Sequence, residues 1–253
     1  MDLITKINKS RGTLKKYLQK EWDTSTIENY SDKEIENIYT NKILKKQNLI
    51  SFGQASSCNF SLQHRKIPSH KLHIIYYNFP ELNANHVKIT KTCADKIDAL
   101  YDNEIINIDD SVIIIILEKI TENLEKSIAN SFSNGQEKLI NEGLSDSIIQ
   151  ENEVLDDSEQ LSYHHFRNIH IFFLDHLSID ISNHSNVPKH ECIRDKNEIQ
   201  RILEKCNSTV SQLPVIFRTD PQAKIKRIAP GDICKITRTS KTGGENEYYR
   251  ICV

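Results

Sequence analysis

The sequence has 253 residues, of which 27% are charged and 38% hydrophobic, and its formal net charge at pH 7 is −2. A chain of this length holds one large domain or two small ones, each with a buried core. Its longest apolar run, residues 112–117, is far too short to span a bilayer, and its charged N-terminal segment lacks the apolar stretch of a signal peptide. We therefore expect a soluble, intracellular protein with no membrane partner.

The six cysteines are scattered without a CxxC pair, as expected for free thiols in a reducing compartment. Four of the ten histidines lie close in sequence: His164, His165, His170 and His176. They lack the spacing that places metal ligands on one face of a helix, so ordinary surface or core positions are the better interpretation. We expect no metal and no cofactor.

The first elements in chain order are two helices. Apolar residues recur with a 3.6-residue period over residues 3–22, which predicts an amphipathic helix that Gly12 weakens or breaks. Ser31 and Glu34 have the spacing of a capping box, which predicts the start of a second helix. The apolar face of this helix is expected to reach Ile43.

Residues 51–70 are rich in polar and turn-forming residues, and we expect a loop there. The following segments alternate in type: residues 72–77 predict a strand, and residues 87–100 predict a helix. Residues 112–117 then predict a strand buried on both faces, followed by a short helix that Thr121 caps. Strand, helix, strand and helix with short connections predict a βαβ unit and a partly parallel sheet.

Residues 133–162 interrupt this alternation. They contain eight acidic residues, one Lys and no aromatic residue. Such a composition buries too little apolar surface to fold alone, so we expect an acidic, flexible insertion. Strand patterns resume at residues 169–174 and again at residues 177–181.

The composition changes near residues 182–187, after which four of the six prolines and three of the seven glycines occur. Residues 184–253 carry thirteen Lys and Arg against eight Asp and Glu. This modest positive charge suits an acidic partner or nucleic acid, although a solvated face is the commoner explanation. We place an N-terminal domain at residues 1–183 and a C-terminal domain at residues 184–253.

The C-terminal elements are short and separated by turn residues. Asp195 and Glu198 are expected to cap the most regular helix of the chain, and Asp220 caps a helical turn with Pro221 at its first position. Strands are expected at residues 213–217, 233–238 and 248–253. The last two form a hairpin, so this domain is predicted to be small and of mixed α/β type.

The VPKH element at residues 187–190 and the segment LPVIFRTDPQAKIKRIAPGDICKITRTSKTGGENEYYRICV at residues 213–253 closely resemble the common fifth subunit of eukaryotic nuclear RNA polymerases. The archaeal member of that family consists of this part alone. The N-terminal part is similar more faintly. The resemblance implies an α/β (α+β) fold with an N-terminal jaw domain, containing a nuclease-like βαβ core, and a C-terminal assembly domain.

The resemblance implies a non-catalytic subunit of a multisubunit DNA-directed RNA polymerase, acting in transcription. Its assembly domain would dock on the largest subunit, among the other polymerase subunits and without forming homo-oligomers. The jaw would lie near downstream duplex DNA, with weak contacts that do not read sequence. The docking candidates are Pro188, Lys189, His190, Leu213, Pro214, Asp220, Pro221, Tyr249 and Arg250. The DNA-proximal candidates are Lys119, Thr121 and Lys126.

Two other functions are weighed against this one. A metal-dependent nuclease would need Glu-x-Lys or Asp-x-Lys on a strand that follows an acidic residue. Asp109 and Asp110 precede such a strand, but Glu118 and Lys119 are adjacent and would point to opposite faces. The alternative that stays open is a scaffold that reuses the assembly domain outside the polymerase.

The origin of the chain also stays open between a cell and a large DNA virus. Its abundant Ile, Asn and Lys indicate an AT-rich genome, and the acidic insertion indicates a divergent branch. A cellular protein would act in the nucleus. A viral one would be found in the virion and the host cytoplasm.

Overall fold

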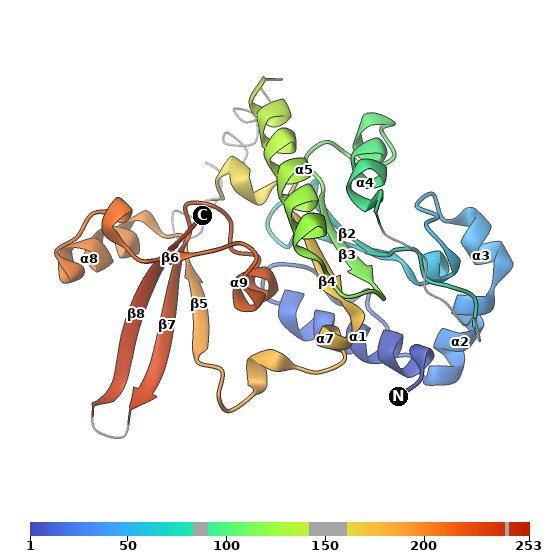
Figure 1. Cartoon of the computed structure of the whole chain (residues 1–253), viewed down its shortest axis with the longest axis horizontal. Coiled ribbons are helices and arrows are strands. Elements are labelled where there is room, and N and C mark those ends of the chain that lie inside the picture. The colour runs from blue at the N-terminus through green and yellow to red at the C-terminus, as the bar shows by residue number, and fades with distance from the viewer. Residues whose placement is uncertain (83–90, 142–160, 241–242) are drawn as a thin grey trace. The chain divides into compact units, whose positions relative to one another are not determined.

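The computed structural model describes residues 1–82, 91–141, 161–240 and 243–253 (Figure 1). Contacts divide the chain into an N-terminal unit, Met1–Glu137 with Phe166–Asp180, and a C-terminal unit, Lys138–His165 with Ile181–Val253. Among the helices in the described ranges, none combines the length and apolar character that crossing a bilayer requires. The domain limits given above stay predictions.

The N-terminal unit is built on a four-stranded sheet in the order β1-β2-β3-β4. The strands are β1 (Phe60–Gln63), β2 (Lys71–Tyr76), β3 (Ser111–Ile116) and β4 (Ile169–Phe173). β1 is antiparallel to β2, whereas β2 is parallel to β3 and β3 is parallel to β4. The predicted α/β class with a partly parallel sheet is therefore confirmed.

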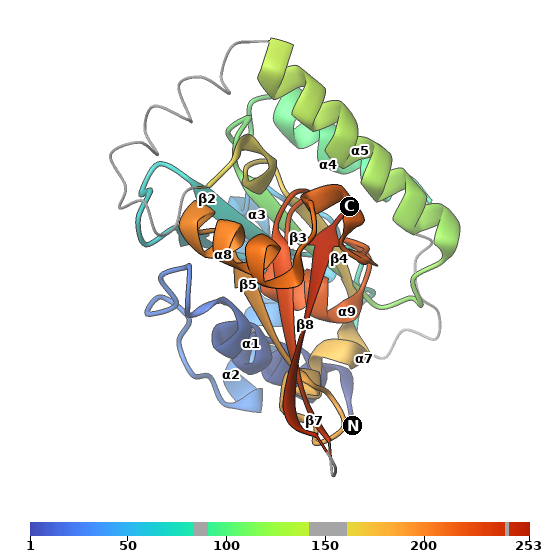
Figure 2. The same ribbon diagram turned by 90° about the vertical axis from the view of Figure 1, so that its left-hand side faces the viewer.

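All six residues of β3 are buried, as the continuous apolar run predicts for a central parallel strand. Helices α4 (Cys93–Asp102) and α5 (Glu122–Asn141) lie side by side on one face of the sheet (Figures 1 and 2). Ile97 of α4 and Ile128 of α5 pack with Ile114 in one core cluster. Helix α1 (Leu3–Leu18) packs on the opposite face, where the Ser10 hydroxyl lies 2.9 Å from the Tyr76 hydroxyl of β2.

Helix α1 (Leu3–Leu18) runs through Gly12 without the break considered there. Gly12 is exposed, and its backbone hydrogen bonds continue the helix, so the missing side chain costs only conformational entropy. Helix α2 (Asp32–Thr40) begins with the predicted capping box. The Ser31 N–H donates to Glu34 Oε2 at 2.7 Å, and the Glu34 N–H donates to Ser31 Oγ at 3.4 Å.

Two predictions for the following segment are wrong. Ile43 does not extend the apolar face of α2, because it lies in a separate helix, α3 (Lys42–Gln47), and is 68% exposed. Residues 51–70 are not a loop throughout, since they contain the 3-10 helix η1 (Gln54–Cys58) and strand β1. Strand β1 forms because it pairs with β2, although the four residues of β1 have no clear strand pattern of their own.

The helix that follows β3 extends into the predicted acidic insertion. Residues 133–141 are the second half of α5, a 20-residue helix rather than a short one, and Leu139 within them is buried. Thr121 caps this helix as expected, accepting from the Leu124 N–H at 3.3 Å. Residues 142–160, the remainder of the predicted insertion apart from its last two residues, lie outside the described residues.

The strand expected at residues 177–181 does not form. Instead α7 (Leu174–Leu177) follows β4 directly, and a 3-10 turn, η4, covers Ile181–Asn183. The alternating pattern of Leu177, Ile179 and Ile181 suits a strand, but Ile179 is 65% exposed and no described strand pairs with it. Periodicity without a partner is not sufficient for a strand.

The C-terminal unit holds a second four-stranded sheet, in the order β5-β7-β8-β6. Its strands are β5 (Lys189–Ile193), β6 (Val215–Ile216), β7 (Ile233–Ser240) and β8 (Gly244–Cys252). β6 runs parallel to β8, whereas the other pairs are antiparallel, so the sheet contains both kinds of pairing.

Two short helices flank this sheet, and both carry the predicted caps. Asp195 accepts from the Asn197 N–H at 2.7 Å at the start of α8 (Lys196–Cys206). Asp220 accepts from the Gln222 N–H at 2.8 Å at the start of α9 (Pro221–Lys226). α8 contributes Ile202 to one core cluster, with Ile251, while α9 contributes Ala223 to another.

Candidate docking site

A pocket of about 420 Å³ opens on the C-terminal unit. It is lined by residues of all four strands and of the segment before α9: His190, Val215, Ile216, Phe217, Thr219, Asp220, Ile236, Arg238 and Arg250. The guanidinium of Arg250 donates to the Val215 carbonyl at 2.9 Å, which ties β8 to the two-residue strand β6 at the pocket. A concave surface that combines apolar and charged side chains is suited to binding a partner segment.

The pocket carries more positive than negative charge. Arg238 and Arg250 face it together with one carboxylate, Asp220, whose oxygen is engaged in capping α9. Burial lowers the pKa of His190 below its ordinary value, although the Pro188 carbonyl and the Asp220 charge oppose this shift, so the imidazole is neutral at pH 7. His190 Nδ1 donates to the Pro188 carbonyl at 2.7 Å. The pocket therefore favours an acidic group on its partner.

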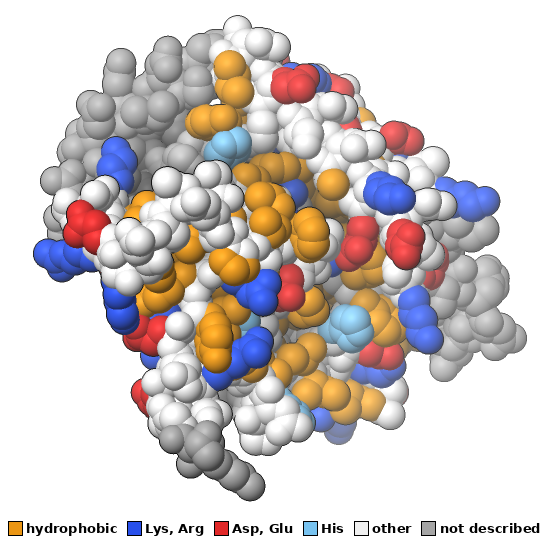
Figure 3. Space-filling model, turned by 60° about the vertical axis from the view of Figure 1, so that its left-hand side comes forward, with side chains coloured by type: hydrophobic (Ala, Val, Ile, Leu, Met, Phe, Trp, Pro, Cys, Tyr) orange, Lys and Arg blue, Asp and Glu red, His pale blue; other side chains and the backbone are white. Residues whose placement is uncertain are grey.

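Apolar side chains at the pocket remain open to solvent. Phe217 is 65% exposed and Val215 is 40% exposed, although Val215 belongs to β6 and Phe217 directly follows it. Figure 3 shows hydrophobic side chains gathered among Lys and Arg side chains on the side of the molecule from which it is viewed. An exposed aromatic residue beside a cationic pocket is typical of a protein interface.

Three of the nine predicted docking residues, His190, Asp220 and Arg250, meet in this pocket. Pro214 and Pro221 are exposed and adjoin pocket residues in the chain. The structure also adds pocket residues that the sequence did not single out: Val215, Ile216, Phe217, Thr219, Ile236 and Arg238. These residues lie in or beside short strands, and nothing in their local sequence distinguishes residues that line a pocket from residues on a solvent-exposed face.

The other predicted docking residues lie elsewhere. Leu213 is only 7% exposed and belongs to the core cluster of α8. Tyr249 packs half-buried against the same cluster, and its hydroxyl donates to Glu247 at 2.7 Å. Pro188 is half-buried, and Lys189 is exposed and forms an ion pair with Glu191 at 2.6 Å. A role of these four in docking stays a prediction.

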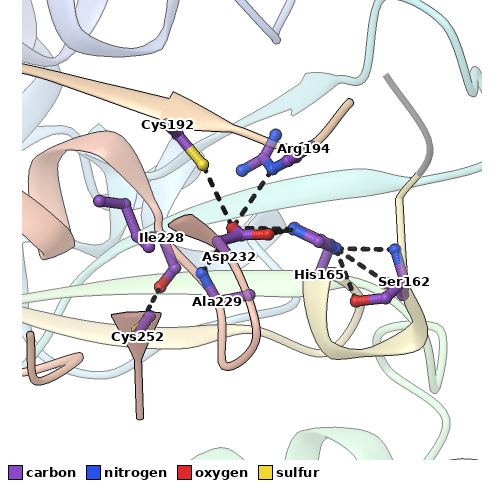
Figure 4. A network of polar contacts seen from close by, with 8 residues as sticks. All are labelled: Ser162, His165, Cys192, Arg194, Ile228, Ala229, Asp232 and Cys252. Carbon is purple, nitrogen blue, oxygen red and sulfur yellow. Dashed lines mark hydrogen bonds and ion pairs between the residues drawn. The ribbon is translucent and has the colours of Figure 1, made fainter. Parts of the chain in front are cut away.

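A buried polar network lies behind the turn that begins β7, centred on Asp232 (Figure 4). His165 Nε2 lies 3.0 Å from both carboxylate oxygens, and the Arg194 Nε–H donates to one of them at 3.3 Å. The Cys192 thiol and the Ala229 N–H also donate to Asp232, at 3.3 Å and 2.9 Å. The sequence indicates Asp232 only as a turn residue, because nothing local connects it with His165, which is 67 positions away.

Several donors stabilise the charged form of Asp232. Burial by itself would raise the pKa of this carboxyl, but the His165 charge and hydrogen bond outweigh it, with help from Arg194 and the Ala229 N–H. The pKa of Asp232 is therefore held well below its usual range. A buried carboxylate with this set of partners fixes the start of β7, and with it the sheet that forms the pocket.

The predicted DNA-proximal residues lie together in the N-terminal unit. Lys119 and Lys126 are exposed on either side of the start of α5, and Thr121 between them caps the helix. Glu122 and Glu125 occupy the first turn of the same helix. The two lysines can therefore offer only a weak positive field to a phosphate backbone.

One group of side chains in the described parts of the N-terminal unit has the composition of a metal site. It consists of His70, Asp109 and Asp110. The sequence did not single out this group for metal binding, because His70 lies 39 positions or more before the two aspartates.

Comparison with known proteins identifies relatives of the C-terminal part of the chain. Residues 179–252 match the family described as RNA polymerase Rpb5, C-terminal domain. DNA-directed RNA polymerase subunit Rpo5 of Methanococcus maripaludis (strain C7) is 47% identical over 73 residues, which cover 29% of this chain and 92% of that protein. The Rpo5 subunits of Nitrosopumilus maritimus and Archaeoglobus fulgidus are 45% and 42% identical, with 87% and 100% of their lengths covered.

Proposed function

This chain belongs to the Rpo5 and Rpb5 family of DNA-directed RNA polymerase subunits, and we propose that it acts as a non-catalytic subunit whose C-terminal unit docks on the largest subunit of the enzyme. The chain is accordingly a component of a multisubunit transcription complex, with other polymerase subunits as its partners. The observation that carries the proposal is the coverage of the relatives: 73 to 77 residues of this chain account for 87 to 100% of whole Rpo5 subunits. In those relatives a polypeptide of about this extent forms the whole subunit, which supports the same role for the C-terminal part of this chain.

We propose that the pocket beside β6 is the centre of the docking surface. Phe217 supplies an exposed aromatic anchor, and Arg238 and Arg250 supply positive charge that an acidic segment of the largest subunit would neutralise. Interfaces typically gain most of their affinity from a few such anchors, with aromatic residues and Arg over-represented among them.

Co-purification from cells that contain the polymerase tests this proposal. The tagged full-length chain should retain the largest subunit through a high-salt wash, and Phe217→Ser should reduce the retained amount about tenfold. Leu49→Ser is the matched control, because Leu49 is 82% exposed but lies in the N-terminal unit. A chain lacking residues 184–253 should retain none.

The outcomes separate the remaining functions. If Phe217→Ser retains the largest subunit as well as the wild type does, the pocket is not the docking centre. If the wild-type chain itself loses the polymerase in high salt, a scaffold outside the enzyme becomes the better interpretation. Recovery from purified virions or from nuclei would show whether the protein is viral or cellular.

We also propose that the N-terminal unit lies near downstream duplex DNA. Support comes from Lys119 and Lys126, which are exposed at the start of α5. Because Glu122 and Glu125 stand beside them, the contact would be weak, directed to phosphates and sensitive to salt.

A further inference from the structure

The amino-terminal ends of β2 and β3 bring three potential metal ligands together. In the parallel register Leu72 lies beside Ser111, and extending this register by two residues places His70 beside Asp109. Asp110 then lies beside Lys71, whose backbone N–H donates to Asp110 Oδ1 at 2.9 Å. The parallel pairing thus builds the group that we call the strand-end cluster: His70, Asp109 and Asp110.

The donor atoms of the strand-end cluster converge. One ligand atom from each of its three residues lies within 4.8 Å of the other two. His70 is 2% exposed and Asp110 is 1% exposed, while Asp109 is half-buried. Three donors at this separation need only small side-chain shifts to reach one ion at bond lengths of about 2.0 to 2.3 Å.

The electrostatics of Asp110 also favour a cation. Its Oδ2 accepts from the Asn107 N–H at 3.1 Å and lies 3.0 Å from His73 Nε2. Among the described residues, His73 is the only basic side chain that contacts this buried carboxylate. A second carboxylate, Asp109, adjoins it in the chain, and the two side chains together concentrate negative charge that attracts a cation.

A nearby buried cation, Arg167, packs on an aromatic ring. The guanidinium of Arg167 lies over the ring of Tyr101, with its central carbon 3.9 Å from the ring centroid. The backbone N–H of Arg167 donates to the Asp109 carbonyl at 2.8 Å, which holds the segment before β3 in place.

We propose that the strand-end cluster binds a divalent transition-metal ion through one His nitrogen and two carboxylate oxygens, with water completing the coordination. Imidazole combined with carboxylates favours ions such as Mn²⁺ or Zn²⁺ over Mg²⁺ and Ca²⁺, which prefer oxygen ligands alone. Asp110 Oδ1 accepts a single hydrogen bond and so keeps a lone pair for the ion, while His73 and the two N–H groups fix the orientation of the carboxylate.

The ion would act in structure rather than in catalysis. Glu118 and Lys119, the pair that failed the nuclease pattern, follow β3 at its opposite end. A metal at the strand-end cluster instead links the segments that lead into β2 and β3. Binding should therefore raise the melting temperature of the protein.

Metal titration of the full-length protein, stripped with a chelator, tests the site. Mn²⁺ is the first probe, because the six cysteines of the chain compete less for it than for Zn²⁺. We expect one equivalent of Mn²⁺ by electron paramagnetic resonance and a rise in melting temperature that Mg²⁺ at the same concentration does not produce. Asp109→Asn, of nearly equal shape, should lose the bound equivalent and the thermal shift.

His176→Ala is the matched control, since it removes an exposed histidine from α7 of the same unit and should bind Mn²⁺ as the wild type does. The proposal is overturned if the wild type binds no Mn²⁺ or Zn²⁺, or if Asp109→Asn binds as much as the wild type. If Asp109→Asn fails to fold, His70→Gln takes its place and should likewise lose the bound Mn²⁺. Retention of Mn²⁺ by His70→Gln would overturn the proposal.

Discussion

At the scale of single residues, the stability of the C-terminal unit depends on a buried carboxylate, that of Asp232. Asp232 is 5% exposed and accepts hydrogen bonds from side chains and backbone of three separate segments. A buried charge of this kind is stable only while its partners remain, because removing one partner leaves the others desolvated and unpaired. The shape of the pocket therefore depends on Asp232, although Asp232 does not line the pocket.

Asp232→Asn should lower the free energy of unfolding of the C-terminal unit by about 3 kcal/mol, because the amide removes the negative charge that pairs with Arg194 and one of the two oxygens that accept hydrogen bonds. Urea unfolding followed by a probe in this unit measures the change. Glu245→Gln, which neutralises an exposed carboxylate on β8 of the same sheet, should change stability by less than about 0.5 kcal/mol. Equal effects of the two substitutions would show that burial of Asp232 does not matter.

The same network predicts a dependence on pH. The pKa of Asp232 is lowered in the folded state, so its ionised form stabilises the fold fully above its unfolded value of about 3.9. This contribution declines as the pH falls below that value. The difference in stability between the wild type and Asp232→Asn should therefore be largest near pH 7 and clearly smaller at pH 3. A difference that stays constant over this range would contradict the assignment.

At the scale of elements, local signals identified helix starts well and strand partners poorly. Ser31, Asp195 and Asp220 cap helices at the predicted positions, because a cap involves residues only two or three positions apart. The strand at residues 60–63 was missed, and one was wrongly predicted at residues 177–181. A strand exists only where a neighbouring strand pairs with it, and that neighbour can lie anywhere in the chain.

Two helix glycines should respond in opposite directions to Ala. Gly12→Ala in α1 should stabilise the N-terminal unit by about 0.5 to 1 kcal/mol, because an added Cβ meets no atom within 4 Å. Gly135→Ala in α5 should instead destabilise it by about 1 to 3 kcal/mol, because the Cβ would lie 2.6 Å from Cδ of the buried Arg167. Thermal or urea unfolding of both variants measures the contrast. Stabilisation by both would mean that α5 does not pack closely on Arg167.

At the scale of the whole molecule, the two units differ in how their proposed roles are supported by sequence and charge. The C-terminal unit matches whole polymerase subunits, whereas the proposed place of the N-terminal unit near DNA depends on two exposed lysines. Charge is distributed accordingly: residues 184–253 have a balance of +5, and the remaining residues sum to −7. An acidic N-terminal part should make few phosphate contacts, and those it makes should depend on local lysines.

Charge reversal tests that contact in the assembled polymerase. Lys119→Glu combined with Lys126→Glu should weaken binding of downstream duplex DNA and reduce the slope of log K against log salt by up to about 2. Lys42→Glu with Lys46→Glu is the matched control, because these two lysines are equally exposed on α3. Binding isotherms at several salt concentrations provide the measurement. A slope that is unchanged in the first variant would remove the DNA proposal and leave the docking proposal intact.

The sequence by itself determined the helix caps, the buried strand β3, the mixed α/β character of the C-terminal part and its family, since each of these depends on neighbouring residues or on a contiguous segment. Only the tertiary structure brought His165 to Asp232, His70 to Asp109, and Phe217 to the edge of a cationic pocket. The physical reason is distance along the chain. Local hydrogen bonds and periodic burial act within a few residues, whereas a pocket, a buried charge network or a ligand cluster forms only when the sheet registers place distant segments side by side.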